Sequence, residues 1–436
     1  MIRARVLPRD DSTCGWLATL PPAPQGRRLA GDRDADFAVV GAGFTGLAAA
    51  RRLAELEPAS RVVVLEAQQA GAGASGRSSG FLVDIAYFTT RMEPDAAERH
   101  IRLSRRGIGE LRALVEEHAI DCAWDDRGWL HVAAGEVGLR DLESLRRWLE
   151  ARGEAYEGLD GGAMAAATGT RFYRGGLRLP GRPLVQAAAL ARGVARTLPR
   201  TVELFEGSPV VSLERSGDLW HLRTPGGAVA ARRVLLATNG YTPGLGRLGR
   251  HLFPLLTFGS LTRPLTPAEQ DAAGGDREWG VLAQDPMGSS VRRTRDQRLL
   301  VRNTVCYTPS LAPSDRIRRR ARRAHRAALD RRFPALAEVE LEFTWAGVMG
   351  ASPSRRHVFG RIGEELYSVA GFTGAGIALG TAGGTLLAEL AAGADSETLR
   401  DMLALPAPGL LPRRPFFDLG ARARVAWMNA SAGPTL

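Results

Sequence analysis

Residues 36–46 read DFAVVGAGFTG, an apolar run of strand type that ends in glycines spaced as GxGxxG. The helical stretch LAAARRLAEL follows at residues 47–56, and a second apolar strand, RVVVLEA, at residues 61–67. A strand, a glycine turn, a helix and a further strand over about thirty residues are typical of a βαβ crossover, which requires a parallel sheet. The stretch therefore predicts an α/β fold.

The three glycines of this turn have separate physical tasks. Gly41 permits the tight turn, Gly43 lets the backbone approach a pyrophosphate, and Gly46 lets the helix pack closely on the strand. The helix that opens here presents N–H groups and partial positive charge to phosphates. Glu66 lies about twenty residues farther on, where a carboxylate accepts hydrogen bonds from ribose hydroxyls. The unit as a whole predicts a dinucleotide site, whereas a glycine turn alone has a purely structural alternative.

Three further glycine-rich stretches occur downstream, at residues 71–80 (GAGASGRSSG), 237–240 (ATNG) and 371–376 (GFTGAG). They offer more places for close backbone approach than one nicotinamide nucleotide requires. An extended flavin dinucleotide passes close to main chain along its whole length, so the glycine pattern favours FAD. An NAD-linked dehydrogenase stays as an alternative.

Composition sets the broad class. The chain has 436 residues, with 44% hydrophobic and 24% charged residues, which is typical of a soluble globular protein. No apolar run reaches the roughly 18 residues of a membrane span, and we see no export signal. The three cysteines, Cys14, Cys122 and Cys306, form no CxxC pair, which indicates neither zinc nor a disulfide framework and favours a cytoplasmic location.

The net charge of +11 raises the alternative of a nucleic-acid partner. The densest basic run, residues 315–332, has apolar residues at helical spacing, so we predict an amphipathic helix with a solvated basic face. It carries no recognisable nucleic-acid motif and no interleaved aromatic residues. We therefore expect no nucleic-acid partner.

Taken together, the four glycine-rich stretches resemble the D-amino-acid-oxidase-type FAD-dependent oxidoreductases, and among them the gamma-glutamylputrescine oxidoreductase-like amine oxidases. The block GASGR at residues 73–77 is the most specific part of a likeness that runs from about residue 15 to residue 393. The resemblance implies a Rossmann-type FAD-binding domain and an interleaved α+β substrate domain built on a mixed or antiparallel sheet. It also implies that a C–N bond of a small amine or amino acid derivative is oxidised by hydride transfer to flavin, giving an imine that hydrolyses. Oxygen or another acceptor would then take the electrons.

The expected domain division is discontinuous. Residues 1–35 form a loosely structured lead, and residues 401–436 form a tail. The FAD-binding domain consists of residues 36–90, 165–250 and 345–400. The substrate domain consists of residues 91–164 and 251–344.

The motifs and the resemblance together define the expected contacts of a noncovalent FAD. Ser75 and Arg77 would hold the pyrophosphate–ribityl region, whereas Ser78, Ser79 and Gly80 would line the flavin ring. The full set is Gly41, Gly43, Phe44, Thr45, Gly46, Glu66, Ala67, Gly73, Ala74, Ser75, Arg77, Ser78, Ser79, Gly80, Val210, Val211, Ala237, Thr238, Gly240, Gly371, Phe372, Thr373, Gly374, Gly376 and Ile377.

The substrate side departs from the family pattern at two positions. Met349 stands where glycine oxidases have a carboxylate-binding arginine, and methionine cannot replace a guanidinium fork. Ala375 stands where the polyamine branch often has histidine. Candidate pocket residues are Tyr87, Arg292, Arg302, Met349 and His357, with Asp84 as a weaker candidate. A lone histidine such as His357 more often has a structural role, and for Arg292 and Arg302 a place on an exposed face is the alternative. A covalent flavin link at Cys306 is not expected.

Overall fold

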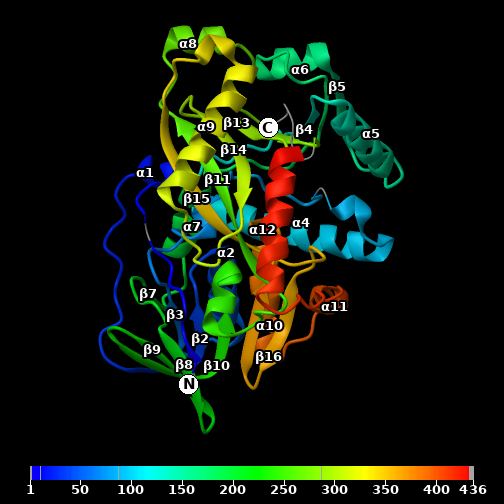
Figure 1. The fold of residues 1–436 in the computed structure, drawn as a ribbon. Helices are drawn as coiled ribbons and strands as arrows, with labels where there is room; N and C mark the ends of the chain where they lie inside the picture. The colour runs from blue at the N-terminus through cyan, green and yellow to red at the C-terminus, as the bar shows by residue number, and fades with distance from the viewer. Residues whose placement is uncertain (1, 10, 87, 286, 432–436) are drawn as a thin grey trace.

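The computed structural model describes residues 2–9, 11–86, 88–285 and 287–431, and its strands form two sheets surrounded by helices (Figure 1). The first sheet is built from segments spread along the whole chain. Its strands are β1 (Ile2–Arg3), β2 (Arg33–Val40), β3 (Val62–Leu65), β7 (Val202–Phe205), β8 (Ser212–Ser216), β9 (Leu219–Thr224), β10 (Gly227–Leu236), β16 (Val358–Gly363) and β17 (Leu366–Ala370).

The centre of this sheet is parallel. Strands β7, β3, β2 and β10 run parallel in that order, and β17 adds in parallel to the second half of β10. Strand β3 and the second half of β2, from Phe37 to Val40, are buried, as expected for a parallel sheet covered on both faces. The predicted βαβ unit is present, with α2 (Phe44–Leu56) as its crossover helix.

Three helices pack together on this sheet through glycine contacts. Helix α10 (Ala378–Ala392) lies between α2 and α4 (Pro94–Glu117). A Cβ atom at Gly384 would lie 2.0 Å from the carbonyl oxygen of Thr45, and one at Gly107 would lie 1.9 Å from that of Ala378. Because no side chain fits there, these glycines permit the close helix packing that brings the first residues of α2 and α10 together.

The second sheet is mixed, and its order is β15-β11-β14-β13-β12-β4-β6-β5. Its neighbouring strands are antiparallel apart from the parallel pair β12 and β4. The bounds are β4 (Leu130–Ala133), β5 (Glu157–Asp160), β6 (Gly175–Arg178), β11 (Phe253–Thr262), β12 (Trp279–Ala283), β13 (Ser290–Arg293), β14 (Leu299–Cys306) and β15 (Leu341–Ala351). The predicted fold class, α/β with a second mixed sheet, is confirmed.

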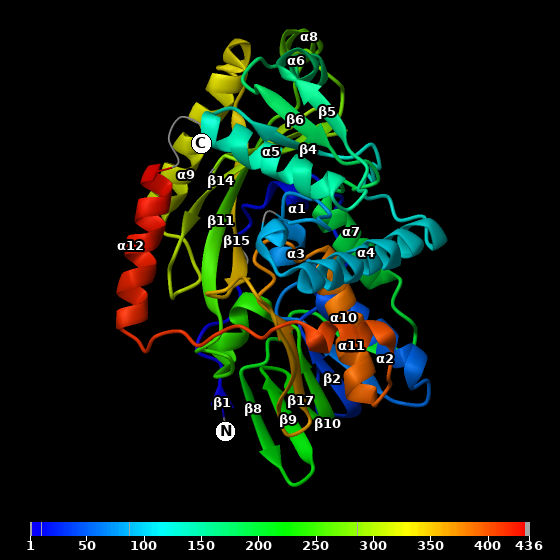
Figure 2. The ribbon, with the colours of Figure 1, turned by 90° about the vertical axis from the view of Figure 1, so that its right-hand side faces the viewer.

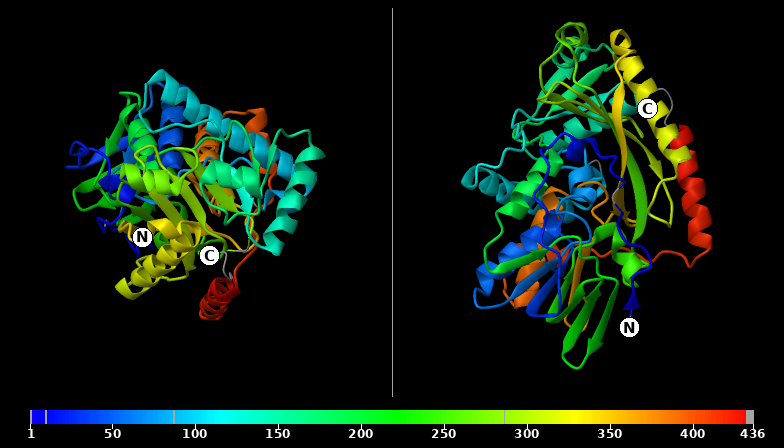
Figure 3. Two further views of the ribbon diagram at one scale, coloured as in Figure 1. Left: turned by 90° about the horizontal axis from the view of Figure 1, so that it is seen from above. Right: turned by 90° about the vertical axis from the view of Figure 1, so that its left-hand side faces the viewer.

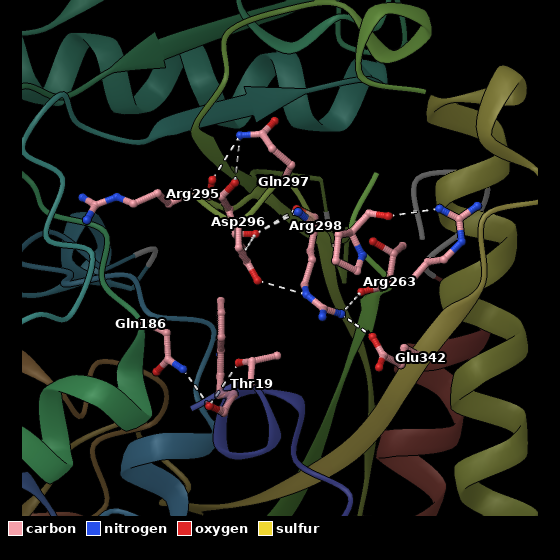
Figure 4. A network of polar contacts seen from close by, with 12 residues as sticks. Thr19, Gln186, Arg263, Arg295, Asp296, Gln297, Arg298 and Glu342 are labelled. Carbon is pink, nitrogen blue, oxygen red and sulfur yellow. Dashed lines mark hydrogen bonds and ion pairs between the residues drawn. The ribbon is translucent and has the colours of Figure 1, made fainter. Parts of the chain in front are cut away.

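The turn between β13 and β14 shows how polar contacts hold this sheet (Figure 4). Arg298 donates from Nε to Asp296 Oδ2 at 3.0 Å and from Nη1 to the Thr262 carbonyl at 2.8 Å, and it also pairs with Glu342 of β15. One guanidinium thereby joins three neighbouring strands at their ends.

The remaining helices surround the two sheets (Figure 2). They are α1 (Gly15–Ala18), α3 (Ala74–Arg77), α5 (Glu136–Glu150), α6 (Gly161–Thr168), α7 (Ala187–Arg196), α8 (Pro267–Ala273), α9 (Asp315–Arg332), α11 (Glu397–Ala404) and α12 (Phe416–Ser431). Helix α9 is the predicted basic helix, and it buries Ala321, Ala328 and Leu329 against the second sheet.

The described parts of the lead and of the tail contain regular elements. The lead forms β1, which pairs with β8, and the short helix α1, whose Trp16 is buried. The tail forms α11 and α12. Strand β6 belongs to the second sheet although it falls within the segment 165–250 assigned to the FAD-binding domain. The domain division as a whole stays a prediction.

Candidate active site

A cavity of about 1360 Å³ joins the two sheets. Its walls include residues at the carboxyl ends of β2, β3 and β10 and residues of β11, β14 and β15. Ligands of open α/β sheets bind at the carboxyl ends of the strands. The volume exceeds the roughly 300–1,000 Å³ of a usual small-molecule pocket, so an extended cofactor and a second molecule can both fit.

Most of the expected cofactor contacts line this cavity. They are Gly41, Gly43, Phe44, Thr45, Glu66, Ala67, Gly73, Ala74, Ser75, Arg77, Ser78, Ser79, Gly80, Val210, Ala237, Thr238, Gly240, Phe372, Thr373, Gly374, Gly376 and Ile377. Gly46, Val211 and Gly371 are not among its lining residues. A Cβ at Gly46 would lie 1.8 Å from the Gly41 carbonyl oxygen, so this glycine serves helix–strand packing.

The first glycine turn is in direct contact with the 71–80 segment. Gly41 has a φ of +103°, a conformation that side chains rarely adopt. A Cβ at Gly43 would lie 2.6 Å from Ser75 Oγ, and the same hydroxyl accepts a hydrogen bond from the Phe44 N–H at 3.1 Å. The two motifs, separated by about thirty residues in the chain, therefore form one surface of exposed main chain.

Glu66 lies at the end of β3 with its carboxylate fixed by main chain. Its Oε2 accepts from the Ala42 N–H at 2.7 Å and its Oε1 from the Gln68 N–H at 2.9 Å. Burial raises the pKa of Glu66, and these two hydrogen bonds oppose that rise. Each carboxylate oxygen keeps acceptor capacity. The carboxylate therefore fits the hydroxyls of a ribose.

Arg77 makes several contacts with protein groups. Its Nε donates to the Ala72 carbonyl at 2.8 Å, and its Nη1 donates to the Ala346 carbonyl at 3.1 Å and to Asp11 Oδ1 at 3.0 Å. The guanidinium thus joins the lead, the 71–80 segment and β15. The expected contact of Arg77 with phosphate or ribityl oxygens stays a prediction.

Two tryptophans hold the same segment from behind. The Trp16 indole N–H donates to the Ser78 carbonyl at 2.8 Å, and that of Trp345 donates to the Arg77 carbonyl at 3.0 Å. Gln186 in turn donates to the Trp16 carbonyl at 2.6 Å (Figure 4). Our sequence interpretation missed this role of the lead, because nothing local in residues 1–35 indicates a partner sixty residues away.

The loop before α10 is tied to the end of β10. The Asn239 side-chain oxygen accepts the Gly371 N–H at 2.9 Å. Residues Phe372 to Ile377 then line the cavity and lead into the first turn of α10. Free N–H groups and partial positive charge at a helix start favour negative charge on a ligand nearby.

Of the predicted pocket residues, Arg302 and Met349 line the cavity. Arg302 lies on β14 opposite Gly259 of β11, and Gly259 lies opposite Trp345 of β15. Met349 is four residues beyond Trp345 along β15 and therefore on the same sheet face, because side chains alternate along a strand. The Trp345 ring covers Gly259, since a Cβ at this glycine would lie 3.1 Å from the ring.

Arg292, His357, Asp84 and Cys306 are not among the lining residues. Arg292 is buried, and it donates to the carbonyls of Val185 at 2.5 Å and Ser79 at 3.4 Å. Burial lowers its pKa to about 10. It therefore supports the 71–80 segment from behind.

His357 and Asp84 are also held within protein. The Nε2 atom of His357 lies 3.1 Å from Met402 Sδ, and burial lowers the pKa of this histidine to about 3. Asp84 accepts from Arg182 Nε at 2.6 Å and from Arg105 Nε at 2.9 Å. Burial opposes the ionisation of Asp84, but these arginines lower its pKa below the ordinary value. Tyr87 lies outside the described residues.

His131 of β4 lines the cavity and was not predicted from the sequence. Its Nδ1 lies 2.5 Å from the side-chain nitrogen of Gln284, and within the described ranges its buried Nε2 has no hydrogen-bond partner. Burial lowers the pKa of His131 to about 3, so the ring is neutral at physiological pH. A lone histidine in a strand carries no motif that could have identified it.

Among residues 2–9, 11–86, 88–285 and 287–431, no helix has the length and apolar character to cross a membrane. The same residues contain no group of three side chains able to hold a metal ion.

The glycine turn, the buried carboxylate and the cavity joining two sheets define a dinucleotide-binding oxidoreductase fold. Residues 36–390 match the family described as FAD dependent oxidoreductase (DAO), and the chain belongs to that family. It is therefore an FAD-dependent oxidoreductase, and the predictions of FAD and of oxidoreductase chemistry are confirmed.

Two relatives and one solved structure illustrate the similarity. Gamma-glutamylputrescine oxidoreductase of Escherichia coli is 30% identical over 408 residues, which cover 88% of this chain and 91% of the relative. An oxidoreductase named OrdL from Haemophilus influenzae is 28% identical over 412 residues, 90% of this chain and 91% of the relative. Glycine oxidase from Geobacillus kaustophilus shares the fold, with a TM-score of 0.71 at 22% identity over 84% of this chain and 96% of that one.

Proposed function

We propose that the protein oxidises a C–N bond of a small amine or amino acid derivative. The name of the Escherichia coli relative, an oxidoreductase of an amine, supports this reaction class. The observation that carries the proposal is the single cavity, which runs from the glycine turn to the face of the second sheet. A molecule against β14 and β15 would share that space with a bound dinucleotide.

The residues of the cofactor end fit FAD. Gly41, Gly43 and Ser75 offer main chain and a hydroxyl to a pyrophosphate, and Glu66 offers its carboxylate to a ribose. Bound FAD would accept a hydride from the carbon next to the substrate nitrogen. The N–H groups at the start of α10 would face the end of the cofactor that gains negative charge.

One part of the substrate end of the cavity is apolar, whereas Gln284, Asp285 and Asn303 line it elsewhere. Its lining residues include Val83, Ile85, Phe88, Met287 and Met349. Such surroundings disfavour a charged ammonium and lower the pKa of a bound amine, so they favour the neutral form that can release a hydride. The neutral ring of His131 adds a polar group without adding charge.

Arg302 gives the substrate end a cation. We propose that it attracts an acidic group of the substrate, remote from the nitrogen that reacts, since Met349 cannot bind a carboxylate. Arginine offers a planar fork that matches carboxylate geometry. The substrate class we favour is therefore an amine that carries a carboxylate.

The test is an anaerobic screen of the purified holoprotein with primary and secondary amines, with and without a carboxylate. Loss of the visible flavin absorbance on mixing, followed by recovery in air or with an added acceptor, is the expected result. If no amine bleaches the flavin while dithionite does, the reaction class is wrong.

Location and electron acceptor are finer proposals. The described cysteines are free, and Cys14 and Cys122 are buried, which suits the reducing cytoplasm that we predict. Either oxygen or another acceptor can take the electrons, and the rate of recovery with each distinguishes an oxidase from a dehydrogenase.

A further inference from the structure

Helix α12 exposes an apolar stripe. Phe416, Leu419 and Trp427 are 74%, 63% and 57% exposed, which is unusual for large apolar side chains. At 3.6 residues per turn, these three side chains fall on one side of the helix, with Ala423 between them. We call Phe416, Leu419, Ala423 and Trp427 the outer stripe. The helix lies beyond the matched family range of residues 36–390, so family membership does not account for it.

The opposite side of α12 already has its partners. The Tyr307 hydroxyl donates to Asp418 Oδ1 at 2.5 Å, and the Phe417 ring lies 5.2 Å from that of Phe253. Asn429 donates from Nδ2 to the Val305 carbonyl at 2.8 Å. These contacts hold the helix against β11 and β14. The outer stripe is therefore turned away from β11 and β14, although Phe416 and Trp427 also line the cavity.

Basic residues flank the outer stripe. Arg413 and Arg414 precede the helix, and Arg422 and Arg424 lie within it, whereas Asp418 is the acid between them in the chain. Asp418 lies on the attached side, with Arg414 Nε 3.6 Å away. The Arg424 guanidinium stacks 4.4 Å from the Trp427 ring centre. Aromatic and aliphatic side chains beside arginines are the composition of helices that lie in a membrane interface.

From this arrangement we infer that α12 binds flat on the surface of an anionic lipid bilayer, with the outer stripe among the headgroups and its arginines on the lipid phosphates. Helix α12 lies at the edge of the molecule in Figure 2 and in both views of Figure 3, on the side that also carries α9. A convex, peripheral helix suits a planar surface. The net charge of +11 also favours an anionic surface, because basic residues near such a membrane are attracted to it.

A second copy of the chain is the less favoured occupant. Pairing two outer stripes around a two-fold axis would bring the four arginines of one copy close to the same four of the other. Like charges placed opposite one another at an interface are strongly unfavourable. Anionic lipid instead supplies the opposite charge over the whole length of the helix.

The binding would also place the active-site cavity at the membrane. Phe416 and Trp427 contribute to the rim of the cavity as well as to the outer stripe. The proposal depends only on α12 and not on the reaction proposed above.

The test is flotation of the flavin-loaded protein with vesicles of phosphatidylcholine alone or mixed with phosphatidylglycerol. We expect at least tenfold more protein to float with the anionic vesicles at low salt, and most of this binding to be lost at high salt. The triple variant F416S/L419S/W427S is expected to lose at least tenfold in binding. Arg422→Gln with Arg424→Gln is expected to remove the preference for anionic lipid.

Two controls keep the test decisive. Leu403 of α11 is 52% exposed and lies outside the stripe, so Leu403→Ser is expected to bind like the parent protein. Leu419 is not a lining residue of the cavity, so Leu419→Asp tests the stripe even if the triple variant loses flavin. Equal binding of Leu419→Asp and the parent protein overturns the proposal. Lipid-independent dimers that dissociate in the Leu419→Asp variant, seen by sedimentation, also overturn it and assign the stripe to a second copy.

Discussion

The two ends of the active-site cavity are built in different ways. The cofactor end consists of main chain, glycines and one fixed carboxylate, and its parts hold one another through short contacts such as Phe44 to Ser75. The substrate end consists of side chains from β4, β14, β15 and the tail, with no shared motif. At the cofactor end, few residues can be substituted without loss of cofactor binding. The substrate end can be altered one residue at a time, so substrate choice can vary while the cofactor stays.

The strongest way to break the cofactor end is Gly46→Val. The new side chain would overlap the Gly41 carbonyl, since even a Cβ would lie 1.8 Å from it. We expect a loss of more than about 4 kcal/mol in the free energy of unfolding and loss of bound flavin. Absorbance spectra and urea unfolding measure both. The matched control is Gly109→Ala in α4, where a Cβ meets nothing within 4 Å and folding should be unaffected or slightly favoured.

Asp84→Asn tests the junction between the two ends. The variant removes the charge of a buried carboxylate that pairs with the buried Arg182 and with the exposed Arg105, which should cost about 3–5 kcal/mol in unfolding free energy while flavin is retained. Because the pKa of Asp84 is lowered in the folded state, its stabilisation is present above the unfolded pKa of about 4 and lost as the pH falls further. Urea unfolding at several pH values measures this. An unchanged stability with a raised KM would instead place Asp84 in the substrate site.

Glu66→Ala tests FAD binding with a smaller expected loss of free energy than the preceding variants. Loss of the hydrogen bonds from a ribose to a charged acceptor should weaken FAD binding about 10- to 100-fold, equivalent to about 1.5–3 kcal/mol. Titration of the flavin-free protein with FAD measures the change. Glu55→Ala, on the surface of α2, is the control. An unchanged FAD affinity would contradict the ribose role of Glu66.

Arg302→Gln tests whether the substrate end of the cavity binds a carboxylate through Arg302. We expect KM to rise about tenfold or more for an amine that carries a carboxylate, and little change for one that does not. Steady-state kinetics with the two substrate types give the comparison. Arg323→Gln, on the exposed side of α9, is the control for loss of charge alone. An equal change for both substrate types would give Arg302 a structural role.

The smallest effect on activity is expected for His357→Gln. Because the folded-state pKa of His357 is about 3, the unfolded chain binds more protons between pH 3 and about 6.5, and stability falls as the pH falls through that window. Removing the histidine should reduce this slope by up to about 1.4 kcal/mol per pH unit. The pH profile of kcat/KM near neutrality should not move. A shifted profile would place His357 at the reacting group.

The sequence was most informative about the residues that bind the cofactor through close approach of the main chain. Gly41, Gly43, Ser75 and Glu66 could be predicted because each belongs to a motif whose spacing follows from backbone geometry. His131 could not, because one histidine in a strand has no local pattern. The same holds for the tie between Arg77 and Asp11, which depends on how the lead folds back over a distant segment. The role of α12 was also missed, since its attached side depends on Tyr307 and Val305, more than a hundred residues earlier.

The order in which the chain is synthesised limits when flavin can be captured. The residues that line the cavity range from Val6 in the lead to Met428 in the last helix. The hydrogen bond between Asn239 and Gly371, which holds the loop before α10, can form only after both residues have been synthesised. A growing chain that has finished only the glycine turn and Glu66 therefore holds a half-open dinucleotide groove. Stable capture of the cofactor must await the carboxyl-terminal fifth of the protein, so truncation of that part should release flavin although the glycine motif is intact.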